Sequence, residues 1–336
     1  MYLLGLESSC DETSAAVIWA DEEGFRICSN IVASQIDVHR LYGGVVPEIA
    51  SRAHVEAISR ITYEALEGAN ITLRDLGAVA VTSHPGLIGA LLVGVNFGKS
   101  LAYANNIPLV SVDHIKAHVA ATYLEHEGLR PPFTALVISG GHTSLFAVED
   151  YTRFSVIGTT RDDAAGEAFD KIARVIGMPY PGGAALDKLA YEGNPRAFSL
   201  PSPALAGDTL DFSFSGLKTA TLNLINSAKQ KGEEIDPADL SASYTHAIVG
   251  AIVKKTAMAL DKTAHKTLVL SGGVAANSHI RRALTELCTS RGVRLCVPSL
   301  SLCGDNAAMV AAAGYFEFLK GRFADTALNA SALDEI

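Results

Sequence analysis

Two short hydrophobic runs in this sequence end in the same three letters. Residues 134–138 read Thr-Ala-Leu-Val-Ile and stop at Ser-Gly-Gly (139–141), and residues 268–270 stop at Ser-Gly-Gly (271–273). An apolar run without alternation predicts a strand that is buried on both faces. Paired glycines let main-chain N–H groups converge on an anion with no Cβ in the way. Two such loops in one chain favour a nucleotide clamp over two ordinary tight turns.

The pattern of hydrophobic and polar positions also predicts a repeated order of elements. In the first half we expect strands at 2–6, 14–19, 25–33, 76–82 and 108–112, and helices at 47–66, at 88–104 and around 114–118. In the second half we expect strands at 134–139, 143–148, 154–158, 266–270 and 293–297, and helices at 163–176, 184–191, 217–225, 240–262, 278–289 and 307–319. Three consecutive strands open each half, so the sequence predicts two similar α/β lobes. Such a pair with glycine loops is typical of actin-like and sugar-kinase-like ATPases.

One long segment, residues 194–215, carries no regular pattern. It contains three prolines, and it leads into Asp-Phe-Ser-Phe-Ser-Gly at 211–216. These letters are too aromatic for a spacer, so we expect a functional loop there.

Length and charge limit the classes of protein to consider. A chain of 336 residues predicts two domains or one large fold with two lobes, and 49% hydrophobic residues suffice for packed cores. The formal net charge of −9 argues against a broadly basic nucleic-acid binder, although a local basic patch remains compatible with it.

The cysteines and the N-terminal residues bear on the compartment. Five cysteines, with no Cys-x-x-Cys pair, fit a reducing compartment better than a disulfide framework. The first residues turn polar at Glu7, too early for a signal peptide, and no apolar run reaches the ~20 residues that a membrane span needs. We therefore expect a cytoplasmic protein with no membrane partner.

Eight motifs, in order along the chain, resemble the TsaD family. They are GLESSCDET (5–13), GGVVPE (43–48), HIKAH (114–118), SGGHT (139–143), DAAGEAFDK (163–171), YPGG (180–183), FSFSGLK (212–218) and GGVAAN (272–277). These enzymes are the tRNA N6-adenosine threonylcarbamoyltransferases, formerly labelled O-sialoglycoprotein endopeptidases. The resemblance covers nearly the whole chain. It implies an α/β, two-lobed actin-like ATPase fold with duplicated lobes, shared with sugar kinases and heat-shock chaperones.

The resemblance also implies that the two lobes have different roles. Residues 1–130 and 305–336 would form an N-terminal lobe that carries the metal ligands. Residues 131–304 would form a C-terminal lobe that carries the nucleotide-binding loops.

His114 and His118 stand four residues apart, so both imidazoles project from one face of a helix and can share an ion. Such a pair alone is more often two ordinary histidines. The resemblance adds Asp305 as a third ligand. Two histidines and a carboxylate suit Fe(II), with zinc as the main competitor. The protease label fails on the same helix, because H-E-x-x-H needs a glutamate where Ile115 stands.

For the substrate, the resemblance assigns the phosphate side to one loop and the nucleoside side to four scattered residues. The loop comprises Val137, Ile138, Ser139, Gly140 and Gly141, and the scattered residues are Asp170, Gly183, Asp187 and Asn277. Carboxylates and a neutral amide suit ribose hydroxyls and a base edge. The alternative for Asp170 is a salt bridge with Lys171 or Arg174, and Asp187 stands beside Lys188.

Asp11 and Glu12 follow the first strand, where actin-like folds face the phosphates. A carboxylate there can orient or deprotonate an attacking amine, and we take Asp11 as the candidate catalytic residue. The alternative is turn chemistry, since aspartate favours turns anyway. His142 and Lys218 are further candidates for contacting a phosphate or the substrate.

The resemblance implies transfer of threonylcarbamoyl from threonylcarbamoyl-AMP to N6 of the adenosine beside the anticodon (position 37), in tRNAs that read codons beginning with A. It also implies a paralogous inactive partner subunit and a small ATPase. Two alternatives stay open, namely an ATP-dependent kinase or ATPase of the same fold, and a non-catalytic scaffold. A strip of Arg52, Lys218, Arg281 and Arg282 is a candidate tRNA surface, and the helix at 88–104 is a candidate docking face.

Overall fold

A computed structural model describes residues 1–203, 205 and 207–333. These residues form two compact units. Unit 1 combines Met1–Pro131, Asp150–Phe154 and the described residues from Pro298 onward, and unit 2 combines Pro132–Glu149 and Ser155–Val297. Among the described helices, none has the length and apolar character that crossing a bilayer requires.

Unit 1 is built on a five-stranded sheet with the order β3-β2-β1-β4-β5. The strands are β1 (Tyr2–Glu7), β2 (Glu12–Ala20), β3 (Phe25–Ser34), β4 (Leu76–His84) and β5 (Leu109–Asp113). β1 pairs antiparallel with β2 and parallel with β4. All five predicted strands are confirmed, and β2 begins two residues earlier than predicted because Glu12 and Thr13 pair with the end of β3.

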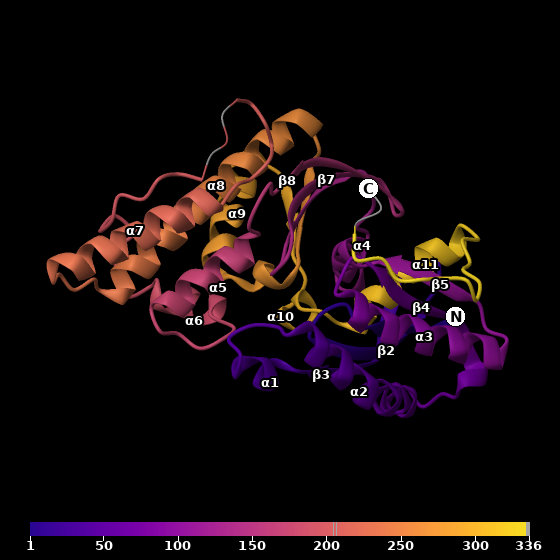
Figure 1. Cartoon of the computed structure of the whole chain (residues 1–336). Coiled ribbons are helices and arrows are strands. Elements are labelled where there is room, and N and C mark those ends of the chain that lie inside the picture. The colour runs from indigo at the N-terminus through magenta and orange to yellow at the C-terminus, as the bar shows by residue number, and fades with distance from the viewer. Residues whose placement is uncertain (204, 206, 334–336) are drawn as a thin grey trace. The chain divides into compact units, whose positions relative to one another are not determined.

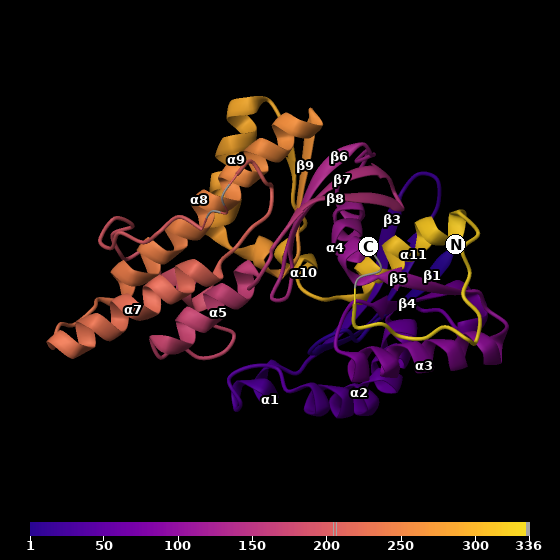
Figure 2. The same cartoon turned by 45° about the horizontal axis from the view of Figure 1, so that its top comes forward.

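Helices cover both faces of this sheet (Figures 1 and 2). The long helices are α2 (Pro47–Gly68), α3 (Ile88–Asn105) and α11 (Ala307–Leu319); the short ones are α1 (Ile36–Arg40), η1 (Leu73–Asp75), α4 (His114–Ala120), η2 (Ala121–Leu124) and α10 (Leu300–Cys303). Leu4 and Leu6 of β1 join the core cluster under α2 and α3. Gly5, between them, faces α11, where a Cβ would lie 2.1 Å from the Ala307 carbonyl oxygen. Burial on both faces explains why β1 is hydrophobic without alternation.

Unit 2 repeats the strand order of unit 1 as β8-β7-β6-β9-β10. Its strands are β6 (Phe133–Ile138), β7 (Thr143–Asp150), β8 (Arg153–Thr159), β9 (Thr267–Ser271) and β10 (Arg294–Cys296). As in unit 1, the first strand pairs antiparallel with the second and parallel with the fourth. The predicted duplication of an α/β lobe is therefore confirmed.

The helices of unit 2 are α5 (Ala165–Val175), α6 (Gly183–Leu189), α7 (Ser215–Lys231), α8 (Pro237–Thr263), η3 (Gly273–Ala276) and α9 (Ser278–Arg291). α7 continues six residues beyond its predicted end. The second glycine pair leads into the 3₁₀ turn η3, and α9 starts only after Asn277. The side-chain oxygen of Asn277 accepts a hydrogen bond from the Ile280 amide (3.0 Å) and caps this helix.

The irregular segment before α7 contributes to the core of unit 2. Phe212 and Phe214 are almost fully buried and stack with their ring centroids 5.9 Å apart. The aromatic residues of this segment therefore serve packing of the core. They do not support the expectation of a functional loop. Residues 204 and 206 of that segment lie outside the described residues.

Candidate metal centre and nucleotide site

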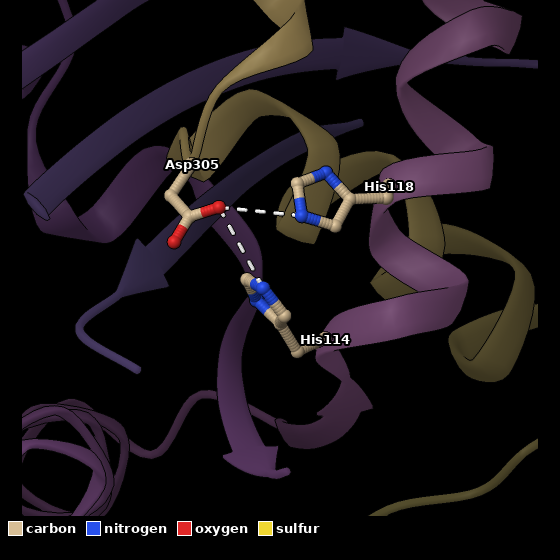
Figure 3. Close-up of side chains that lie close together, drawn as sticks. All are labelled: His114, His118 and Asp305. Carbon is tan, nitrogen blue, oxygen red and sulfur yellow. Dashed lines mark ion pairs between the residues drawn. The ribbon is translucent and has the colours of Figure 1, made fainter. Parts of the chain in front are cut away.

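The two histidines of α4 meet Asp305 in unit 1 (Figure 3). α4 begins directly after β5, and the Asp113 carboxylate caps it by accepting from the amides of Ile115 (2.8 Å) and Lys116 (3.1 Å). The Asp305 Oδ1 atom lies 3.2 Å from His118 Nε2 and 3.6 Å from His114 Nε2. One donor atom from each residue falls within 4.8 Å of the other two. The predicted ligands therefore come together as a cluster able to hold one ion.

His118 gives the clearest sign that this cluster suits a cation. Its side chain is fully buried, and neither ring nitrogen makes a hydrogen bond to any described residue. The Asp305 oxygen 3.2 Å from Nε2 makes no hydrogen bond with it, and a cation held by both atoms would compensate the buried nitrogen. Two imidazoles with one carboxylate are a donor set for Fe(II) or zinc.

Glu7, which sequence reasoning did not single out, orients His114. The Glu7 carboxylate lies 3.1 Å from His114 Nδ1, and it also accepts from the Ser9 amide (2.6 Å) and the Thr82 hydroxyl (2.7 Å). Its side chain is fully buried at the end of β1. A carboxylate on the far nitrogen fixes the ring so that Nε2 faces the ion position. The signal for this role was a charged residue at the end of a buried strand.

The pKa values of Glu7 and His114 are both shifted from their usual values. Burial raises the pKa of Glu7, but the adjacent His114 outweighs it, and the pKa is lowered overall. Burial lowers the pKa of His114, while the charges of Asp305 and Glu7 outweigh it and raise that pKa to about 9. Without a cation, the cluster therefore holds a proton in the place of the positive charge.

The turn that carries Asp11 lies beside the same cluster. Asp11 is almost fully buried, and its carbonyl oxygen accepts from the Gln35 amide (2.9 Å). Burial, followed by the charges of Asp305 and Asp11, raises the pKa of Glu12 to about 9. Asp11, Glu12 and Asp305 thus form one group of interacting carboxyls, in which Glu12 is protonated at neutral pH.

In unit 2, the loop with Gly140 and Gly141 is the tip of the hairpin between β6 and β7. The Ser139 amide donates to the His142 carbonyl (2.8 Å), and the His142 amide donates to the Ser139 hydroxyl (3.1 Å). Both glycines are exposed, and a Cβ on either one would meet open space. The loop therefore presents bare main chain. Val137 and Ile138 are buried in β6.

Two other glycines bring neighbouring segments against this loop. A Cβ on Gly166, in the first turn of α5, would lie 2.6 Å from the Ser139 carbonyl oxygen. Gly272 has φ +91°, and its Cβ would lie 2.4 Å from the Ile138 carbonyl oxygen. Only glycine permits these approaches. The first glycine loop, the start of α5 and the second glycine loop therefore lie together in unit 2.

Two of the predicted nucleoside residues, Asp170 and Asp187, accept hydrogen bonds from neighbouring segments of unit 2. The Asp170 carboxylate accepts from the amides of Gly182 (2.8 Å) and Gly183 (2.9 Å). The Asp187 carboxylate accepts from the amide (3.0 Å) and hydroxyl (2.8 Å) of Ser278, next to Asn277. It also lies 2.7 Å from His279 Nδ1. Both carboxylates thus fix loops of the candidate site.

The basic residues considered for tRNA binding already have contacts. Lys218 is paired with Asp163 (2.5 Å) and Arg52 with Glu48 (2.7 Å). Arg281 donates to a main-chain carbonyl, and Arg282 lies over the Tyr191 ring, 5.7 Å from its centroid. Arg52 lies in unit 1 and the other three in unit 2.

Comparison with known proteins gives a consistent result across the chain. Residues 26–312 match the family model of TsaD, described as tRNA N6-adenosine threonylcarbamoyltransferase. The curated protein of that name from Clostridium botulinum (strain Kyoto / Type A2) is 50% identical over 328 residues, which cover 98% of this chain and 96% of the relative. The protein of that name from Clostridium perfringens (strain 13 / Type A) has the same identity and coverage.

Solved structures agree on the fold at much lower identity. HypF of T. kodakarensis matches with a TM-score of 0.64 at 14% identity, over 99% of this chain and 49% of that chain. The Clostridium difficile activator of 2-hydroxyisocaproyl-CoA dehydratase, with bound ADPNP, gives 0.54 at 15% identity over 96% and 97%. The ROK hexokinase of Thermus thermophilus gives 0.51 at 15% identity over 96% and 100%. The expected actin-like, sugar-kinase-like fold is confirmed.

Proposed function

This chain belongs to the TsaD family, and from that premise we propose that it threonylcarbamoylates tRNA. The threonylcarbamoyl group passes from threonylcarbamoyl-AMP to N6 of the adenosine beside the anticodon (position 37), in tRNAs that read codons beginning with A. The 50% identity with transferases of this name, over nearly the whole chain, carries the proposal. The absence of a glutamate after His114 argues against the older protease label.

The reaction exchanges one bond to the carbamoyl carbon for another. The N6 nitrogen attacks that carbon, a C–N bond forms, the C–O bond to the phosphate breaks, and AMP leaves with the electron pair. The attacking nitrogen must lose a proton, and Asp11 is the carboxylate that accepts it. In unit 2, main-chain N–H groups of residues 139–141 receive the phosphate, where bare backbone is exposed. Asp170, Gly183, Asp187 and Asn277 shape the nucleoside site.

His114, His118 and Asp305 would hold Fe(II), with zinc as the competing ion. When bound, the ion would supply positive charge to an oxygen of the substrate. Glu7 keeps His114 oriented for this purpose. In this proposal residues 1–130 and 305–336 form the metal-bearing lobe, and residues 131–304 form the nucleotide-bearing lobe.

The partners proposed are tRNA, a paralogous inactive subunit and a small ATPase. The glycines of α3 face unit 1 itself, because a Cβ on Gly89, Gly94 or Gly98 would meet Ser51, Ser8 or Leu6, respectively. The exposed apolar residues of the neighbouring helices α2 and α3 offer contact area instead; they are Val55, Tyr63, Ile88 and Tyr103. A cytoplasmic location follows from this substrate.

The test is mass spectrometry of tRNA nucleosides after incubation with threonylcarbamoyl-AMP, in the presence of the partner subunits. We expect threonylcarbamoyladenosine with the wild-type chain and little with Asp11→Ala. Full modification with Asp11→Ala would favour a scaffold role. Steady ATP hydrolysis by the pure chain, without modified tRNA, would favour a kinase or ATPase.

A further inference from the structure

A buried histidine on α2 contacts the catalytic turn at both of its ends. His54 has no exposed surface. Its Nε2 atom lies 3.0 Å from the Cys10 carbonyl oxygen, and its Nδ1 atom lies 2.7 Å from the Thr13 hydroxyl oxygen. A carbonyl oxygen can only accept, so Nε2 carries the hydrogen. Nδ1 is then the acceptor, and the Thr13 hydroxyl donates to it. The two contacts select one neutral tautomer.

The two anchor points bracket the acidic residues of the turn. Cys10 directly precedes Asp11, and Thr13 directly follows Glu12. Between them, the Asp11 carbonyl is held by the Gln35 amide at 2.9 Å. The Cys10 main chain before the two carboxyls and the Thr13 side chain after them are thus both tied to α2 through a single side chain.

Neither catalysis by His54 itself nor simple packing accounts for this arrangement. The ring is shielded from solvent, and both nitrogens are engaged within unit 1. Burial lowers its pKa, which agrees with a neutral ring that does not exchange protons with a substrate. An apolar side chain would fill the same space but would make neither directional contact. The two hydrogen bonds of His54 are useful only if the turn must keep one conformation.

We propose that His54 is a positioning residue of the transfer reaction, which holds the turn at residues 10–13 so that Asp11 keeps its geometry toward the attacking amine. This inference rests on the proposed function. It predicts a loss in the chemical step, since a small displacement of a reacting group costs rate more than binding.

Three substitutions separate the two contacts. His54→Gln can direct its amide N–H toward the Cys10 carbonyl, but it removes the ring nitrogen Nδ1 that accepts from Thr13. Thr13→Val is nearly isosteric and removes only the hydroxyl. His54→Leu removes both contacts. Thr62→Val is the matched control, because Thr62 is also buried on α2 but its hydroxyl donates to Ile58 of its own helix.

Each variant is assayed with the partner subunits, tRNA and threonylcarbamoyl-AMP, alongside metal content and thermal unfolding. We expect kcat to fall roughly tenfold for His54→Gln and for Thr13→Val, and roughly a hundredfold for His54→Leu. KM for both substrates and the metal content should stay unchanged. Thr62→Val should keep wild-type kcat.

Wild-type kcat in folded His54→Leu, or in Thr13→Val, would overturn the inference. Lower activity that comes only from a raised KM or from lost metal would also overturn it. The ¹⁵N shifts of the His54 ring in the wild-type chain give a readout apart from activity: a neutral ring protonated on Nε2 supports the inference, and any other state overturns it. If the wild-type chain forms no modified tRNA, the proposed function fails, and the ring shifts still decide how His54 holds the turn.

Discussion

The metal cluster of unit 1 and the glycine-loop region of unit 2 are built on the same strand order but use their polar groups differently. In unit 1, buried side chains converge, and His118 has no hydrogen bond to any described residue. In unit 2, the carboxylates of Asp170 and Asp187 already accept from neighbouring amides, and the bare groups belong to the main chain at Gly140 and Gly141.

This difference separates two kinds of site. A cluster of side-chain donors depends on residue identity and protonation, because each donor atom contributes directly to the ion. A site made of main-chain groups depends on loop conformation, and the side chains around it act by holding that conformation. Substitutions of the cluster residues in unit 1 should therefore remove the metal, whereas substitutions around the glycine loops of unit 2 should weaken substrate binding and leave the metal in place.

The largest effect is expected for the metal ligands. His118→Ala should lose stoichiometric metal and at least roughly a hundredfold in kcat, since even the partners of metal ligands are worth 10–100-fold. Elemental analysis and steady-state kinetics measure both. His246→Ala, at an exposed histidine of α8, is the control. Undiminished iron or zinc in His118→Ala would refute the ligand assignment.

Glu7→Gln tests whether orientation matters as well as ligation. The amide can still contact His114 but no longer carries charge, so metal affinity should fall roughly tenfold to a hundredfold while the fold persists. Competition with a chelator measures the affinity. Glu64→Gln, in an exposed ion pair with Arg60, is the matched control. An unchanged affinity would leave Glu7 with a purely structural role.

Metal affinity should depend on pH at values well above the usual pKa of histidine. In the metal-free protein, burial lowers the pKa of His114, and the charges of Asp305 and Glu7 outweigh it and raise the pKa to about 9. A metal needs the unprotonated Nε2, so binding displaces that proton. Affinity should therefore rise with pH, by up to roughly tenfold per unit, and level off near pH 9. Zinc titrations from pH 6 to 10 would contradict this if affinity levelled off near 6.5.

In unit 2, Asp170→Ala should free the amides of Gly182 and Gly183 and loosen that loop. We expect KM for threonylcarbamoyl-AMP to rise roughly tenfold, with metal content unchanged. Glu233→Ala, at an exposed position after α7, should have no effect. Loss of metal in Asp170→Ala would erase the proposed division between the two regions.

The smallest effect is expected for the basic residues. Reversing Arg52 and Lys218 to glutamate should raise KM for tRNA roughly threefold, because both charges are already partly neutralised by Glu48 and Asp163. KM for threonylcarbamoyl-AMP should not change. If tRNA affinity responds neither to these changes nor to salt, a partner subunit supplies the RNA-binding surface.

The positions of the strands along the chain could be predicted from the sequence because burial on both faces leaves a local signature. β1, β4, β6 and β9 are apolar without alternation, and each is followed by a glycine or polar turn. The spacing of His114 and His118 is likewise local, since four residues make about one helical turn. Asp305 was reached through family resemblance, because a polar, glycine-bearing loop before the last helix does not by itself indicate a ligand.

The sequence by itself determined the duplicated fold, the glycine loops, the histidine pair and the family. Tertiary structure alone decided what the buried polar residues do. Glu7 lies at the end of a core strand, and only the approach of α4 makes it the partner of His114. His54 reads as an ordinary helix residue until α2 packs against the Cys10–Thr13 turn. The physical reason is that hydrophobic periodicity is set by neighbours along the chain, whereas the hydrogen bonds of a buried polar group are set by segments that meet only on folding.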